Sequence, residues 1–246
     1  MYLKTLALVL RISDYNDRDA LLTLLTRDHG KLVAKARGLR RKNSPLAAPC
    51  QLLALSEVTL FEYRGMYTIN EAHSVELFEP LRRDLLKLTL GSYFAQAGEV
   101  ISQEDAPGSD LQSLVLNCLY ALSEMDLPLS QIKAVFELRI ACIAGYTPDL
   151  RACAGCGCDN VTYFDLSGGC LLCEGCKNLN SGLRHPISAA TVQGMRYIVS
   201  CDPKRLFQFS MGDENMYQLS CISEAYLITQ LERGFSTLDF YKSLLI

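Results

Sequence analysis

Apolar and polar residues alternate along the first eighty residues of the chain, and a period of two is typical of strands with one buried face. The pattern predicts five strands, over residues 5–11, 20–26, 31–36, 51–63 and 66–77. Tight turns are expected at 27–30, where Gly30 tolerates a positive φ, and at 64–65. Five short strands in so short a stretch favour a small barrel or a sandwich.

Pro80 marks the change to a helical pattern. Between residues 81 and 101 the apolar positions recur at spacings of three and four, which places them on one face of a helix. Further helices are predicted over 111–125, 129 or 130–144, 188–200 and 215–233, with a loop at 105–108. Ser130 is the expected N-cap of the third helix and Gly145 its expected C-cap. The sequence therefore predicts an α+β chain with a β domain over 1–80 and a helical domain over 81–246.

Hydropathy gives no sign of a membrane segment, because no apolar run approaches the ~18 residues that a span needs. The first ten residues are apolar, but they alternate like a strand and lack a basic leader followed by a small-residue cleavage site. We therefore expect a cytoplasmic protein without a membrane partner. In that compartment the eleven cysteines stay reduced, so a cluster of them indicates a metal site rather than disulfides.

Six cysteines lie in the segments CAGCGC and CLLCEGC; they are Cys153, Cys156, Cys158, Cys170, Cys173 and Cys176. A C-x2-C pair forms a turn that presents two sulfurs to one ion, and two such pairs complete the tetrahedral site that zinc prefers. We predict Cys153 with Cys156, and Cys173 with Cys176, since the latter turn contains a glycine whereas Cys170 to Cys173 encloses two leucines. The spacing leaves open whether Cys158 or Cys170 replaces one of these ligands.

A closed site of four thiolates has no free position for water or substrate, so the expected zinc is structural. Between residues 153 and 176 there is no Lys or Arg but there are three acidic residues, and a phosphate-binding knuckle would be basic. A redox role like that of thioredoxin needs a βαβ context, which this segment lacks. The cysteines are therefore expected to fasten a loop.

Basic residues are concentrated in one stretch. Residues 1–80 carry eleven basic and nine acidic side chains, whereas the remainder carries thirteen and eighteen. No acid occurs between Asp28 and Glu57, and that interval holds Lys31, Lys35, Arg37, Arg40, Arg41 and Lys42. A cationic loop on a small barrel suits a phosphate backbone, and Arg64 with Tyr63 and Tyr67 on a later hairpin would extend the surface with rings for base stacking. A solvated turn with buried aromatic rings is the competing interpretation.

No enzyme motif is present. The sequence contains no P-loop, no G-x-G-x-x-G after a strand and no G-x-S-x-G, and its three histidines lie in separate segments. We therefore expect neither an active site nor a small-molecule substrate.

Four stretches in this order resemble the RecO family of DNA repair proteins, the recombination mediators of the bacterial RecF pathway. DYNDRDALLTLLTRDHGKL is similar to the family's first hairpin, and KARGLRRKNS to its basic stretch, although Leu39 stands where a small residue is expected. GYTPDLRACAGCG and YFDLSGGCLLCEGC resemble its zinc segment, with two additional cysteines. LERGFSTLDFYKSLL resembles its C-terminal helix, so the resemblance covers essentially the whole chain.

The resemblance implies an OB-fold barrel over 1–80 as the DNA-binding domain, followed by a helical domain over 81–246 with a zinc module at 151–180. It implies a protein that is not an enzyme and that binds single- and double-stranded DNA and anneals complementary strands. With RecR, such a protein helps to load RecA onto DNA coated by single-strand-binding protein. We expect it at the nucleoid in the cytoplasm, with DNA contacts from Lys31, Lys35, Arg37, Arg40, Arg41, Lys42 and Arg64.

The resemblance also implies that the acidic C-terminal tail of single-strand-binding protein docks on the helical domain. Lys133, Arg139 and Arg196 are the basic residues proposed to receive it. The alternative class is a zinc-stapled adaptor that binds only proteins and has no DNA-binding activity of its own.

Overall fold

A computed structural model describes residues 2–104, 106–178 and 182–245 of the 246-residue chain. These residues form two compact units, one comprising Met1–Met125 with Phe235–Ile246 and the other Asp126–Gly234. The predicted domain boundary after residue 80 is a different division and stays a prediction. The predicted loop at 105–108 and zinc module at 151–180 each include positions outside the described residues, namely 105, 179 and 180.

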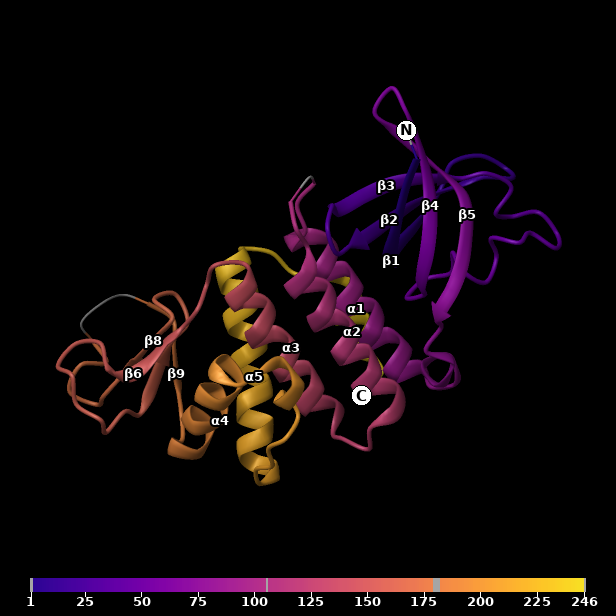
Figure 1. Cartoon of the computed structure of the whole chain (residues 1–246). Helices are drawn as coiled ribbons and strands as arrows, with labels where there is room; N and C mark the ends of the chain where they lie inside the picture. The colour runs from indigo at the N-terminus through magenta and orange to yellow at the C-terminus, as the bar shows by residue number, and fades with distance from the viewer. Residues whose placement is uncertain (1, 105, 179–181, 246) are drawn as a thin grey trace. The chain divides into compact units, whose positions relative to one another are not determined.

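The first unit contains a closed barrel with the strand order β1-β2-β3-β5-β4 (Figure 1). Its strands are β1 (Tyr2–Asp14), β2 (Ala20–Thr26), β3 (Gly30–Ala36), β4 (Leu55–Tyr63) and β5 (Met66–Glu76). β1 pairs with both β2 and β4, and a short parallel register between β3 and β5 closes the barrel. The predicted five-stranded barrel is confirmed. Two strands differ appreciably in their bounds: β1 is longer than the predicted 5–11, and β4 starts later than predicted because residues 51–53 form a bend and turn.

Alternate side chains of the strands fill the barrel interior, as the period of two requires. Leu22 and Leu24 of β2 and Leu60 of β4 are fully buried there. Leu39, from the basic stretch, packs partly buried against this cluster. The leucine at this position therefore contributes apolar surface to the barrel core.

Three helices and a short 3-10 turn complete the first unit; they are η1 (Glu79–Arg83), α1 (Leu85–Ile101), α2 (Ser109–Glu124) and α6 (Ser236–Ser243). The predicted helix over 81–101 therefore begins later, at a new N-cap, Asp84, whose side chain accepts a hydrogen bond from the Lys87 N–H. Gln112 of α2 donates to the carbonyl oxygens of Leu6 and Leu25, which ties this helix to the barrel.

The second unit is built on α3 (Leu129–Ile143), α4 (Ala189–Ser200) and α5 (Asp213–Leu231), with the 3-10 turn η2 (Pro203–Arg205). The prediction of Ser130 as an N-cap was wrong, because α3 already begins at Leu129 after Pro128 and Ser130 lies inside its first turn. Gly145 follows α3 with a φ of 93°, as a glycine after a helix end does. In the described part of the chain no helix has the length and apolarity needed to cross a membrane.

A four-stranded sheet in the order β6-β8-β7-β9 belongs to the same unit. Its strands are β6 (Asp149–Cys153), β7 (Tyr163–Asp165), β8 (Cys170–Leu172) and β9 (Arg184–Pro186). Each has only three to five residues, so the sheet has little hydrogen bonding of its own. The cysteine segments flank these strands, which places the metal candidates at the sheet.

Candidate nucleic-acid interface and metal centre

One carboxylate fixes the basic loop where it leaves β3. Asp19 accepts hydrogen bonds from the Gly38 N–H at 2.8 Å, from Lys35 Nζ at 3.0 Å and from the Asn16 amide at 3.0 Å. These bonds, the Gly38 bond first, hold the pKa of Asp19 well below its ordinary value. No sequence pattern indicates this role of Asp19, because the three donors come from separate positions in the chain.

Two of the predicted DNA-contacting cations are engaged within the protein. Lys35 pairs with Asp19 and also lies over the Tyr15 ring, 4.2 Å from its centroid. The Arg40 guanidinium forms an ion pair with Asp14. Their charges are partly neutralised, so they offer less to a phosphate than the other cations of the loop.

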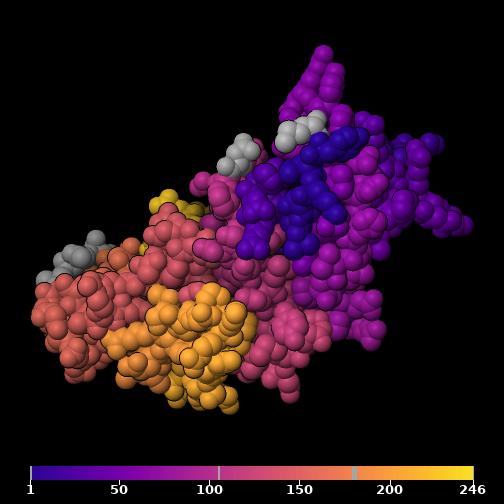
Figure 2. All heavy atoms as spheres, viewed as in Figure 1, coloured from indigo at the N-terminus to yellow at the C-terminus, as the bar shows by residue number. Residues whose placement is uncertain are grey.

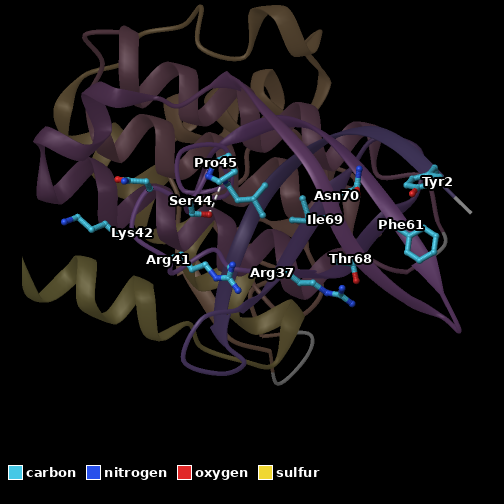
Figure 3. A pocket seen from close by; sticks show the side chains of 13 residues that line it. Tyr2, Arg37, Arg41, Lys42, Ser44, Pro45, Phe61, Thr68, Ile69 and Asn70 are labelled. Carbon is cyan, nitrogen blue, oxygen red and sulfur yellow. Dashed lines mark hydrogen bonds between the residues drawn. The ribbon is translucent and has the colours of Figure 1, made fainter.

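Arg37, Arg41 and Lys42 differ from that pair. All three are exposed, and none forms an ion pair with the described residues. They line a hollow of about 600 Å³ on the barrel (Figure 3). The structure thus brings together three of the seven predicted contacts as unpaired cations.

The two remaining predicted contacts lie apart from this hollow. Lys31 stands half-buried at the start of β3. Arg64 is at the tip of the β4–β5 hairpin, which projects at the top of Figure 2, and its guanidinium lies 5.3 Å from the centre of the exposed Tyr63 ring. Tyr67 packs partly buried against the barrel core, as the competing interpretation of the aromatic residues expected.

Sequence reasoning missed another aromatic pair. Tyr2 of β1 and Phe61 of β4 stand opposite each other across the two strands, with ring centroids 5.2 Å apart, and both line the hollow. Only the register between strands far apart in sequence brings them together. No local pattern could have signalled the pair.

The four predicted metal ligands lie together in the second unit. The Sγ atoms of Cys153, Cys156, Cys173 and Cys176 all lie within 4.8 Å of one another, and those of Cys156 and Cys173 are 3.7 Å apart. Tetrahedral zinc with bonds of about 2.3 Å separates its sulfurs by about 3.8 Å. The cluster can therefore hold a metal ion, and its all-sulfur donor set fits zinc.

Backbone amides support this arrangement. The Cys173 N–H donates to the Cys153 sulfur at 3.3 Å, and Gly157, at a φ of 76°, turns the chain after the first pair. Burial acts to raise the pKa of the Cys153 thiol, but the amides of Cys173, Cys156 and Gly155 outweigh it and lower the pKa to about 6. A thiol that ionises readily is a ready metal ligand.

The two other cysteines of the segment are outside this group of four. Cys158 directs its thiol to the Asn160 carbonyl oxygen at 3.7 Å. Cys170 lies on β8, and burial, together with the nearby carboxylate of Asp165, raises the pKa of its thiol. Among the described residues, the geometry thus favours the pairing chosen from the sequence over the one that uses Cys170.

The three proposed docking residues are all engaged within the second unit. Lys133 is only 4% exposed and pairs with Glu137 and Glu224 at 3.0 and 2.8 Å. A buried and paired ammonium is not available to a partner, so Lys133 is withdrawn from the docking set. This burial could not be foreseen, because Glu224 is supplied by a helix much later in the chain.

Arg139 and Arg196 are half-buried and donate to backbone carbonyl groups. Arg139 donates to the Ile198 and Val199 oxygens near the end of α4. Arg196 donates to the oxygens of Leu150 and Arg151, which attaches α4 to β6. Arg196 also lines two surface hollows, so it is the better placed of the two to meet a partner.

The closed five-stranded barrel with its basic, aromatic-lined hollow defines an OB-fold protein, a class whose barrels bind oligonucleotides and oligosaccharides. The family description "Recombination protein O N terminal" matches residues 1–78, and "Recombination protein O C terminal" matches residues 82–239. The chain therefore belongs to the RecO family.

Curated relatives agree with this membership over nearly the whole chain. The DNA repair protein RecO of Acetivibrio thermocellus is 34% identical over 99% of this chain and 97% of its own length. That of Alkaliphilus metalliredigens is 28% identical over 99% of this chain and 100% of its own length. That of Heliobacterium modesticaldum is 33% identical over 88% of this chain and 80% of its own length.

Proposed function

We propose that the protein is a DNA repair and recombination mediator that binds single- and double-stranded DNA and anneals complementary strands. With RecR it would assist the loading of RecA onto DNA coated by single-strand-binding protein. Membership of the RecO family, whose relatives are named as DNA repair proteins, supports this role. The proposal places the protein at the nucleoid in the cytoplasm and assigns it no catalytic step, small-molecule substrate or membrane partner.

The observation that carries the proposal is the set of unpaired cations at the hollow. Arg37, Arg41 and Lys42 can each meet a phosphate, and phosphate contacts carry no sequence information, which suits a mediator that acts on any damaged site. Cations that neutralise two strands at once also lower their mutual repulsion. That effect is a physical route to annealing.

The four-cysteine cluster is proposed to hold a structural zinc ion. When bound, the ion would cross-link the two turns, and four thiolates would leave it no open position for chemistry. The chain's own contribution is to hold the four sulfurs close together and to lower the pKa of the Cys153 thiol with backbone amides. The cluster would thus stabilise the short-stranded sheet of the second unit.

The second unit is the proposed docking site for the acidic tail of single-strand-binding protein. Arg196, and after it Arg139, remain the candidates, since each residue is only half-buried and Arg196 also lines two surface hollows. A zinc-stapled adaptor without DNA binding is the alternative that the following measurement separates.

The test is the fluorescence anisotropy of labelled single-stranded DNA titrated with protein over a range of salt concentrations. Wild type should bind tightly at low salt and weaken steeply as salt rises. In Arg37→Ala/Arg41→Ala, the slope of log affinity against log salt concentration should become less negative by about 1.4, because each lost phosphate contact removes about 0.7 from the slope.

Lys4→Ala/Arg11→Ala is the matched control. It removes the same charge from the same barrel, but Lys4 and Arg11 pair with Glu57 and Glu99 and do not line the hollow. Its slope should stay close to that of wild type. Absence of wild-type binding at low salt would shift the conclusion to the adaptor.

A further inference from the structure

Both rings of the aromatic pair at the hollow are exposed to solvent. Tyr2 is 64% and Phe61 38% exposed, although both belong to strands of the barrel. Apolar rings left in water on a protein surface often mark a binding site. Because both rings line the hollow that holds the cations, the pair and the charges form one surface.

The lining residues are arranged by type. Figure 3 shows Tyr2 and Phe61 together at one end, Arg37 and Arg41 nearer the middle, and Lys42 at the other end. Polar side chains of β5, Thr68 and Asn70, lie between the rings and the far cations. Among the described residues that line it, none carries a carboxylate. The hollow therefore joins an anion-binding end to an aromatic end.

This arrangement matches the two parts of a nucleotide. The phosphate is anionic, and the base offers a flat face that stacks on aromatic rings whatever its identity. The volume of about 600 Å³ lies within the range of pockets that hold small ligands, so at least one nucleotide fits. We infer that the hollow holds an unpaired nucleotide, with its phosphate on Arg37 and Arg41 and its base against Tyr2 and Phe61.

The inference rests on the proposed DNA binding and makes it more specific. A base in a duplex is already stacked between its neighbours and paired, so it reaches a ring on a protein only after it is extruded. The hollow therefore selects unpaired strand, while the cations alone accept either form. One surface would thus bind both kinds of DNA and recognise the single-stranded kind by its free bases.

A purely structural role for the rings is the competing explanation. Tyr2 and Phe61 are direct cross-strand partners, and such aromatic pairs stabilise a sheet. If the rings only stabilise the sheet, their removal lowers the stability of the protein and changes the affinity for every DNA ligand by the same factor. Base stacking instead predicts a change in the ratio between ligands that have and lack bases.

The experiment compares three labelled ligands of equal length: an oligothymidylate, the same backbone with abasic sites, and a duplex. Anisotropy titrations are made with wild type and with Tyr2→Val/Phe61→Val, in which valine keeps the strand preference but removes the rings. Thermal unfolding of each protein is recorded alongside. Tyr120→Leu is the matched control, because Tyr120 is an exposed ring of α2 in the same unit that does not line the hollow.

Wild type should bind the oligothymidylate about five- to hundred-fold more tightly than the abasic strand. The double variant should lose this preference while its affinities for abasic strand and duplex stay unchanged. Tyr120→Leu and the ring-preserving Phe61→Tyr should keep the preference. A double variant that retains the preference, or that loses affinity for all three ligands equally together with stability, overturns the inference. Wild type that prefers neither strand also overturns it. Wild type that binds none of the ligands overturns the proposed function as well.

Discussion

At the residue scale, Asp19 pairs with Lys35 and anchors the backbone of the basic loop. Its carboxylate holds Lys35 and the Gly38 backbone, and so fixes the start of the loop that carries Arg37 and Arg41. In the sequence it is one of several acidic residues in a polar turn, with nothing to set it apart. The bonds that make it important come from the folded loop, and a periodic pattern contains no information about them.

Asp19→Asn should remove a pH-dependent part of the stability. The pKa of Asp19 is lower in the folded chain than its ordinary value of 3.8, so the carboxylate stabilises the fold fully above that value. The contribution declines as the pH falls through 3.8 towards the lower folded pKa. Thermal midpoints measured from about pH 6 to pH 3 should therefore fall less steeply in the variant than in wild type. Parallel curves would show that the carboxylate does not anchor the loop.

At the element scale, the predicted parts were those whose signals are local. The alternation of apolar and polar residues predicted the barrel strands, and the two C-x2-C pairs predicted the four cysteines whose sulfurs lie together in the structure. The N-cap of α3 was misplaced, because the helix begins at Leu129 and its cap is Pro128, two residues before the predicted cap at Ser130. Alternation did not reveal the sheet β6-β8-β7-β9, because strands of three to five residues are too short to show a period.

Loss of a cysteine ligand should release the metal and loosen this sheet. Cys153→Ser and Cys173→Ser should each lower the bound metal from about one ion per chain to nearly none and lower the thermal midpoint of the second unit. Elemental analysis with thermal unfolding measures both effects, while DNA affinity of the barrel should not change. Cys221→Ser, an exposed cysteine outside the cluster, is the control. Full metal content in Cys153→Ser would refute the assignment of that ligand.

At the scale of the whole molecule, the first unit is assembled from two distant parts of the chain. α6 returns to α1, where Thr237 Oγ1 donates to the Gln96 side chain at 2.5 Å. Phe235, just before α6, meets the Tyr93 ring edge-on at 5.4 Å and is only 1% exposed. From the sequence, α6 was expected only because the end of the chain resembles the C-terminal helix of the family. Its short amphipathic pattern does not say which unit it joins.

Phe235→Ala should therefore destabilise the unit that contains the barrel. Truncating a buried phenylalanine costs about 3–5 kcal/mol of unfolding free energy. Phe240→Ala, in the same segment but 53% exposed, should cost much less. Urea titrations followed by circular dichroism compare the two. Equal losses would mean that the contact of Phe235 with α1 is not what holds α6 in place.

Because α6 packs on α1 from the far end of the chain, the first unit can be completed only after the second unit has been synthesised. The barrel strands leave the ribosome first, and the face of α1 that carries Tyr93 then stays uncovered while the whole second unit is made. A nascent chain that halts before Phe235 would keep this apolar face open to chaperones and proteases.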